Sequence, residues 1–314
     1  MTATSSSAPL RTRTHKPNGR RPNRRRKEAL KGLLFVAPAM IMVLVFFVFP
    51  VMFTAWMSLH KWPLLGAPTW IGLRNYTRMF SDERFYSALG FTAYYTAIVT
   101  VVIFAFAFPM AMLVEQKRRA VPVYRTFFFL PVVVGLASAS LLWTWLANID
   151  SGFFSPLMER LGLTNGRINL LATFDLAFWT IIAMVVWKIA GFTMIILLTG
   201  LQSIPAELVE ASRIDGAKRL QRFRYLTLPL MRKPLALALV LSVTGSILAF
   251  DQFYIMTSGG PQNRMITIVY YIVNQSFVSF NLGYGAALSI AVLVILLVLS
   301  VAQLWLLRDK GEQA

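Results

Sequence analysis

The sequence contains six apolar runs that are each long enough to cross a lipid bilayer, and these runs constrain the fold more than any other feature. The first extends from Leu33 to Trp56 and holds 24 consecutive uncharged residues. A helix rises 1.5 Å per residue, so this run spans the roughly 30 Å of hydrocarbon in a membrane. Five further runs lie at about residues 86–114, 122–147, 174–200, 234–256 and 283–307. We therefore expect an all-α membrane protein with six transmembrane helices between residues 33 and 307.

The composition agrees with this expectation. Hydrophobic residues make up 57% of the 314 residues and the mean hydropathy is +0.61, which is more apolar material than one soluble core could bury. The net charge of +18 would suggest nucleic acid if it lay on a soluble face, but it lies mostly in short segments between the apolar runs. We expect contact with membrane lipid and no nucleic-acid partner. Residues 1–32, rich in Ser, Pro and Arg, are expected to form a disordered basic tail.

The distribution of basic residues predicts the orientation in the membrane. With six spans both termini lie on one side, and that side carries 23 Lys and Arg residues against 7 on the other. Because cytoplasmic loops carry the excess of Lys and Arg, both termini and the segment 205–229 should face the cytoplasm. Residues 308–314 would then be a cytoplasmic C-terminal tail.

The segment 205–229 is polar and strongly charged, although it lies between two long apolar runs. Pro205 suits the first turn of a short helix, and Glu207 and Glu210 place negative charge near the positive end of its dipole. Gly216 predicts a break, because glycine tolerates positive φ. A second helix is predicted from Ala217 to Leu226. Such a segment cannot lie in hydrocarbon, so we expect it to contact headgroups or a protein partner.

Three short motifs in this segment resemble the EAA loop of ABC importer permeases. They are Glu210-Ala211-Ser212, Asp215-Gly216-Ala217 and Leu226-Thr227-Leu228-Pro229. The Gly and Pro are in register with the family pattern, whereas Ser212 replaces its second Ala and Leu226 its Ile. The resemblance implies that the segment is a coupling helix that docks in a groove of an ATPase subunit. The coupling residues would be Glu207, Glu210, Ala211, Ser212, Asp215, Gly216, Ala217, Leu228 and Pro229.

A second group of motifs is similar to the sugar-importing branch of these permeases. It comprises Phe250-Asp251-Gln252-Phe253-Tyr254, Gly259-Gly260-Pro261, Tyr270-Tyr271 and Gly283-Tyr284-Gly285-Ala286-Ala287. Gly259, Gly260 and Pro261 must also end a helix and form a structural loop, because they supply neither helix propensity nor a donor at the proline. The resemblance covers roughly residues 30–307 and implies the type I ABC importer permease (MetI-like) fold.

The resemblance also implies the partners. They would be a second, non-identical permease subunit, two ATP-binding subunits and an extracytoplasmic solute-binding protein, assembled on a multi-pass protein of the bacterial plasma (inner) membrane. The sequence has no phosphate-binding G-x-x-x-x-G-K-[ST] motif and no G-x-S-x-G motif, so we expect no enzymatic activity. ATP and Mg would be used by the partner ATPase. With no Cys and only His15 and His60, we expect no metal site and no cofactor bound by this chain.

Candidate residues of a substrate pathway are few. Lys188 lies in the middle of the fourth run, where it either lines the pathway or forms a structural pair or hydrogen bonds to helix ends. Asp175 and Asp251 also lie within or near membrane depth, and Asp251 either caps a loop or contacts ligand. Trp143, Trp145, Phe253 and Tyr254 either stack on a sugar or serve in packing and at the membrane interface. The pathway candidates are Lys188, Asp251, Phe253, Tyr254 and Asn274.

These observations predict a permease subunit of an ATP-driven ABC importer for a sugar, oligosaccharide or polyol. One alternative is a permease for another solute, such as a phosphorylated polyol, which clustered arginines facing the pathway would favour. Another is a stand-alone secondary transporter, but the inverted repeats with broken helices expected of that class are not visible, and the 205–229 segment would be unexplained. A third is a membrane scaffold without transport activity.

Overall fold

The computed structural model describes residues 22–115 and 121–306, and the remainder of the predicted basic tail and the predicted C-terminal tail lie outside these ranges. The chain divides into two compact units, residues 1–53 and 54–314. In the first unit, helix α1 (Pro22–Val43) is followed by a π-helical turn (Leu44–Val48), and α2 (Phe49–Met57) continues into the second unit. Residues 22–32, expected to be disordered, are therefore helical. Pro22 suits a first helical position, and the Lys, Glu, Ala and Leu residues after it have high helix propensity.

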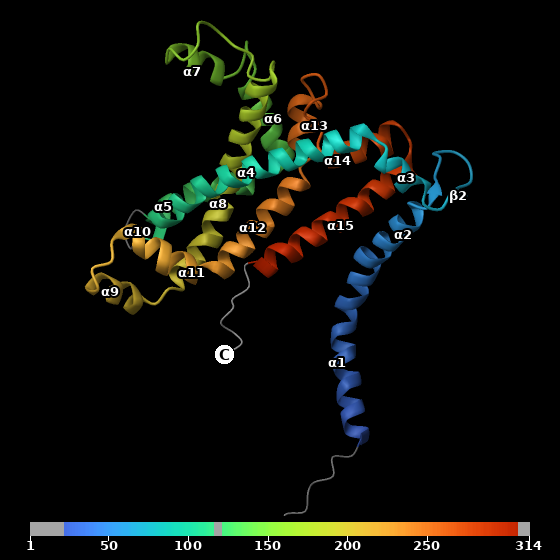
Figure 1. Cartoon of the computed structure of the whole chain (residues 1–314), viewed down its shortest axis with the longest axis horizontal. Coiled ribbons are helices and arrows are strands. Elements are labelled where there is room, and N and C mark those ends of the chain that lie inside the picture. Colours follow the sequence, from blue (N-terminus) through green and yellow to red (C-terminus); the bar gives the residue numbers. More distant parts are fainter. Residues whose placement is uncertain (1–21, 116–120, 307–314) are drawn as a thin grey trace, which may run out of the picture. The chain divides into compact units, whose positions relative to one another are not determined.

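The second unit begins with a small hairpin and then forms the long helix α4. Strands β1 (His60–Lys61) and β2 (Thr69–Trp70) pair antiparallel, with His60 opposite Trp70. Helix α3 (Arg74–Phe80) precedes α4 (Glu83–Glu115), which contains Pro109. The second predicted run is therefore one uninterrupted helix (Figure 1).

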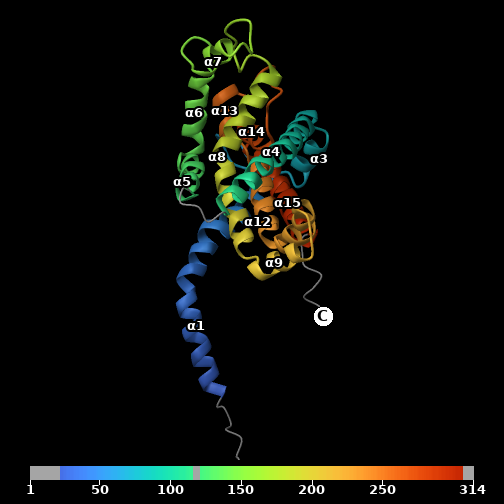
Figure 2. The same cartoon turned by 90° about the vertical axis from the view of Figure 1, so that its left-hand side faces the viewer.

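The third predicted run, 122–147, is not one straight helix. It forms α5 (Val121–Val133) and α6 (Leu136–Leu146), whose axes differ by 96°. Pro131 lacks an amide donor and Gly135 has low helix propensity, so the two together favour an interruption that hydropathy does not reveal. The short helix α7 (Phe154–Arg160) follows on the surface, and α8 (Phe174–Gln202) then crosses the unit without a break. Figure 2 shows α5 and α6 beside α8.

The last third of the chain is also more broken than predicted. Helices α9 (Ala206–Ile214), α10 (Arg219–Arg222) and α11 (Leu228–Leu230), with a π turn at Phe223–Thr227, precede α12 (Arg232–Ile247) at a bend of 75°. The predicted run 234–256 stops at Ile247, and α13 (Asp251–Thr257) begins a new helix, because the carboxylate of Asp251 suits the positive end of a helix dipole. Helix α14 (Ile268–Val273), a π turn (Asn274–Val278) and α15 (Leu282–Leu306) complete the chain.

Among the described residues, four helices are long and apolar enough to cross a membrane, and two bent pairs bring the number to six if each is one span. The four are Gly32–Met57, Glu83–Glu115, Phe174–Gln202 and Leu282–Leu306. This is the predicted all-α class. Lipid is as apolar as leucine, so close packing rather than water exclusion must hold such helices together.

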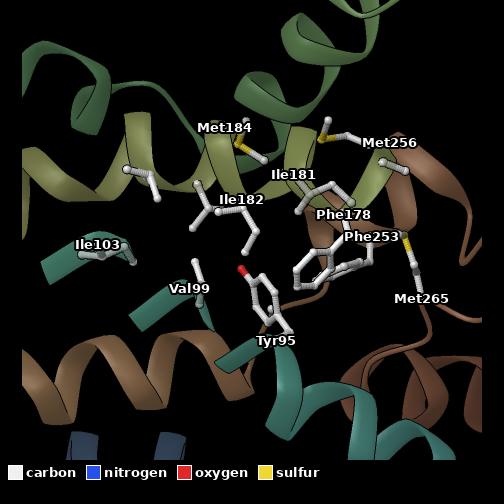
Figure 3. Packing of buried hydrophobic residues seen from close by; sticks show 14 of the residues in the cluster. Tyr95, Val99, Ile103, Phe178, Ile181, Ile182, Met184, Phe253, Met256 and Met265 are labelled. Atoms are coloured by element: carbon white, nitrogen blue, oxygen red, sulfur yellow. The ribbon is translucent and has the colours of Figure 1, made fainter. Parts of the chain in front are cut away.

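The core lies where α4 and α8 pack along each other. Tyr95, Phe178 and Phe253 are almost fully buried there, and the ring of Tyr95 meets that of Phe253 edge-on at 4.9 Å (Figure 3). Edge-to-face packing adds about 0.5–1.5 kcal/mol beyond area burial. Gly191 brings α8 against α5, since a Cβ at this position would lie 2.0 Å from the carbonyl oxygen of Phe128. The neighbouring helices are thus closely packed around α8.

Candidate functional site

The segment 205–229 folds as helix, turn and helix at one end of the second unit (Figure 1). Pro205 is the N-cap of α9 rather than part of its first turn, which contains Glu207. At the other end, Gly216 has φ +74°. Its N–H donates to the Arg213 carbonyl at 3.1 Å, and the Ala217 N–H donates to the Ser212 carbonyl at 3.0 Å. These two bonds form a Schellman motif, which requires the left-handed conformation that glycine adopts without strain.

Large apolar side chains of this segment project into solvent. Ile214, Leu220 and Tyr225 are 86%, 75% and 73% exposed, although the neighbouring residues are mainly charged. A hollow of about 430 Å³ lies between α9 and α10, lined among others by Ser212, Gly216 and Tyr225. Exposed apolar side chains around a hollow, rimmed by charge, are typical of a protein-binding surface.

The other predicted coupling residues lie on the same small structure. Glu210 and Ala211 are exposed on α9, and Asp215 is its C-cap. Leu228 and Pro229 lie in α11, where they are half-buried. The segment is attached to the core by Phe223, whose ring meets that of Phe108 in α4 edge-on at 5.1 Å. A displacement of α9 and α10 would therefore act on both α4 and α12.

The predicted pathway residues do not form one cluster. Phe253 is fully buried against Tyr95 and Phe91, so its ring belongs to the core. Tyr254 is half exposed and stacks on Phe250 at 5.1 Å. The Tyr270 ring is nearly perpendicular to both, at 5.6 Å from Tyr254 and 5.9 Å from Phe250. Asp251, in the first turn of α13, directly follows Phe250 in the sequence. Of the tryptophans, Trp143 packs on Phe154 and Trp187, and Trp145 is exposed.

Lys188 is buried in the middle of α8 and engages the break between α5 and α6. Its Nζ donates to the carbonyl oxygens of Val134 at 2.5 Å, Val132 at 3.2 Å and Pro131 at 3.5 Å. A broken helix leaves its last carbonyl groups without their usual donors, although the Pro131 carbonyl also accepts the Val134 N–H at 3.3 Å. Asp175, in contrast, is exposed in the first turn of α8.

A network around Asp82 was not recognised in the sequence. Its Oδ2 accepts hydrogen bonds from the hydroxyls of Tyr271 and Tyr284, both at 2.5 Å, and its Oδ1 accepts the Arg84 N–H at 3.0 Å. The Arg78 guanidinium lies 4.1 Å above the Tyr284 ring. Burial acts to raise the pKa of Asp82, but the two hydroxyls and the backbone N–H groups of Arg84 and Phe85 outweigh it and lower the pKa below its ordinary value. The carboxylate therefore joins the start of α4 to α14 and α15.

The predicted structural loop reverses the chain after α13. Ser258 and Gly259 have φ +49° and +79°, and the Met265 N–H donates back to the Gly259 carbonyl at 3.1 Å. A Cβ at Gly259 would lie 2.9 Å from the Tyr270 ring, so the close approach of this ring also requires glycine. Gly260 and Pro261 follow within the same turn. Over residues 22–115 and 121–306, no group of three or more His, Cys, Asp or Glu side chains is placed to hold a metal ion.

Comparison with known proteins shows the family to which a chain with these features belongs. Residues 116–311 match the family described as "Binding-protein-dependent transport system inner membrane component". The trehalose/maltose transport system permease protein MalF of Thermococcus litoralis is 33% identical over 87% of this chain and 92% of that protein. The probable ABC transporter permease protein YurN of Bacillus subtilis is 31% identical over 89% and 97%. The fold is similar to a chain of a bacterial alginate ABC transporter, crystallised with an alginate pentasaccharide-bound periplasmic protein, with TM-score 0.78, 20% identity and coverage of 92% and 97%.

Proposed function

The chain belongs to the family of binding-protein-dependent transport system inner membrane components, and from this premise we propose that it is the permease subunit of an ATP-driven importer for a carbohydrate. It is a transport subunit rather than an enzyme. The observation that carries the proposal is the segment 205–229, with its Schellman motif at Gly216 and its exposed apolar side chains. A surface that must fit a partner and transmit displacement needs such a fixed turn at Gly216.

In this proposal the segment docks on one of two ATP-binding subunits, which use ATP and Mg. Ile214, Leu220 and Tyr225 would enter the partner's groove, and the exposed carboxylate of Glu210 would form a charge-assisted contact at its edge. Closure of the ATPases would then displace α9 and α10. The Phe223–Phe108 contact and the bend before α12 would carry this displacement into the spans.

A second permease subunit, expected to be non-identical, would complete the pathway in the bacterial plasma (inner) membrane. An extracytoplasmic binding protein would deliver the solute, and the crystal structure of the similar alginate transporter with a periplasmic protein supports this. Both termini and the segment 205–229 would face the cytoplasm, because the basic residues are concentrated on that side.

Two observations support a carbohydrate as solute. Phe250, Tyr254 and Tyr270 form an aromatic group, and Asp251 is adjacent to Phe250 in the sequence. Sugars bind to aromatic faces, and carboxylates accept their hydroxyl hydrogens. The names of similar proteins include a trehalose/maltose permease and an alginate transporter. We assign Tyr254 and Asp251 to the pathway and Phe253 to packing of the core.

The test uses two variants of the segment, each with a matched control at the opposite end of the unit. Glu210→Lys reverses an exposed charge on α9, and Glu159→Lys does the same on α7. Gly216→Leu places a side chain at φ +74°, and Gly162→Leu does so at φ +69° after α7; neither position has an atom within 4 Å of an added Cβ. The backbone cost is about 1–2 kcal/mol at both glycines, so only the partner's groove distinguishes them.

The complex is purified with its ATPase, and co-purification, solute-stimulated ATP hydrolysis and uptake are measured. We expect Glu210→Lys and Gly216→Leu to lose uptake and the coupling of hydrolysis to solute, whereas both controls retain them. If the two variants match the wild type in all three assays, the segment is not a coupling element and the proposal fails.

A further inference from the structure

A cavity of about 550 Å³ lies at the end of the second unit opposite the segment 205–229. Its lining residues belong to the start of α4, to the loop after α13, and to α14 and the π turn that follows it; Figure 1 labels the three helices. Its nine lining residues include two arginines, Arg84 and Arg264, and three residues with side-chain amides, Asn263, Asn274 and Gln275. Its volume is within the range of about 300–1,000 Å³ found for small-molecule sites.

The two arginines have no carboxylate partner in the described part of the chain. Asp82 lines the adjoining hollow, but it already accepts hydrogen bonds from Tyr271, Tyr284 and the Arg84 backbone. The Arg264 guanidinium lies 4.9 Å above the Phe174 ring, and this contact holds the group by its face. The N–H groups at its edge are left for a ligand, in the fork arrangement that suits carboxylate and phosphate.

Gln275 gives a second, independent indication of a ligand. Its side chain is only 6% exposed. Its Oε1 accepts a hydrogen bond of 3.5 Å from Asn281, but its Nε2 has no acceptor among the residues that the structure describes. Gln275 lines the cavity, and its amide donor has no protein acceptor there among the described residues, so an acceptor group of a ligand would complete the site.

We propose that this cavity binds the anionic group of the transported solute, a carboxylate or a phosphate, so that the carbohydrate carried by the importer is an acidic one. This inference rests on the proposed function and specifies its substrate class. The cavity supplies two positive charges and three amides at what the proposed topology makes the outer mouth of the pathway. Lys188, a buried cation elsewhere in the bundle, is directed at three carbonyl groups and does not serve this purpose.

The test compares acidic and neutral probes on the intact transporter complex in nanodiscs of phosphatidylcholine. The pairs are glucuronate with glucose and glycerol 3-phosphate with glycerol, and binding is measured by calorimetry. We expect an acidic probe to bind at least tenfold more tightly than its neutral counterpart, and 0.5 M salt to reduce only that difference. The double variant Arg84→Gln, Arg264→Gln should lose the preference. Arg264→Lys should keep part of it, because lysine retains the charge but not the fork.

The matched control is the double variant Arg160→Gln, Arg167→Gln, which removes two exposed arginines from the segment around α7. It should retain the preference for the acidic probe. Equal binding of each acidic and neutral pair, or an unchanged preference in the Arg84/Arg264 variant, would overturn the proposal.

Two further outcomes would assign the cavity to another anion, and each would also overturn the proposal. If the variant changes only the retention of phosphatidylglycerol in mixed nanodiscs, the site binds a lipid headgroup. If it changes only the affinity for the binding protein, the site receives a carboxylate of that protein. If the Arg84/Arg264 variant takes up a neutral carbohydrate as fast as the wild type does, the chain is still a carbohydrate permease, but the inference of an acidic solute fails.

Discussion

Replacement of Lys188 by Met should weaken the third span where it breaks. The ammonium group donates to three carbonyls between Pro131 and Val134, and methionine has similar length but no donor. Hydrogen bonds to a charged group contribute about 1.5–3 kcal/mol each, and the bond to Pro131, at 3.5 Å, counts for little. Methionine does not incur the desolvation cost of a buried ammonium group, and this offsets part of the lost hydrogen-bond energy. We expect a net destabilisation of about 2 kcal/mol.

The assay is thermal unfolding of the purified complex in nanodiscs, combined with solute affinity. Lys188→Met should lower the unfolding temperature while solute affinity in the folded fraction is unchanged. Lys188→Arg retains a permanent donor and should recover part of the stability. The control is Thr199→Val on the same helix, where an exposed hydroxyl bonds only to the Ile196 carbonyl of its own helix. A normal unfolding temperature together with altered solute selectivity would refute this reasoning and assign Lys188 to the pathway.

Three further predictions follow from close contacts and from topology. Gly191→Ala should destabilise the unit by about 1–3 kcal/mol, because its Cβ would lie 2.0 Å from the Phe128 carbonyl oxygen, whereas Gly245→Ala, with open space in α12, should be neutral or slightly stabilising in the same unfolding assay. Asp82→Asn should lower the free energy of unfolding by about 2 kcal/mol at neutral pH. Folding lowers the pKa of Asp82, so the stabilisation by its carboxylate is complete above pH of about 4 and is lost as the pH falls through the pKa of the folded state. The unfolding temperatures of variant and wild type should therefore converge in acid, and a difference that stays constant with pH would contradict this. A cysteine introduced at Arg219 should resist membrane-impermeant thiol reagents applied outside and one at Asn165 should react, and the reverse pattern would overturn the orientation.

The sequence predicted the elements that depend on local pattern. The apolar runs predicted α4, α8 and α15, since length and hydropathy alone define an unbroken span. A helix, a break and a second helix between Pro205 and Pro229 followed from Pro, Glu and Gly at short spacings. The resemblance to a permease family, recognised on the same residues, is confirmed by the family match and by the named relatives.

The features that were missed depend on contacts between distant residues. The break at Gly135 is hidden in an apolar run, and Lys188, which donates to its carbonyls, lies 54 to 57 residues further along the chain. Asp82 meets Tyr271 and Tyr284 across 189 and 202 residues, so no local spacing indicates their network. The position of Phe253 also depends on distant contacts. Its motif suggested the pathway, but only three-dimensional packing reveals that Tyr95 and Phe91 enclose it.

The contact between α8 and the break also has a consequence for the order of synthesis. A lysine at the centre of a helix opposes membrane insertion by roughly 2.5–3.5 kcal/mol on translocon scales, and Lys188 is the middle residue of Phe174–Gln202. The carbonyls that accept its hydrogens belong to residues 131–134, which leave the ribosome before α8 does. The nascent chain therefore already contains the acceptors for this charge when the fourth span reaches the membrane.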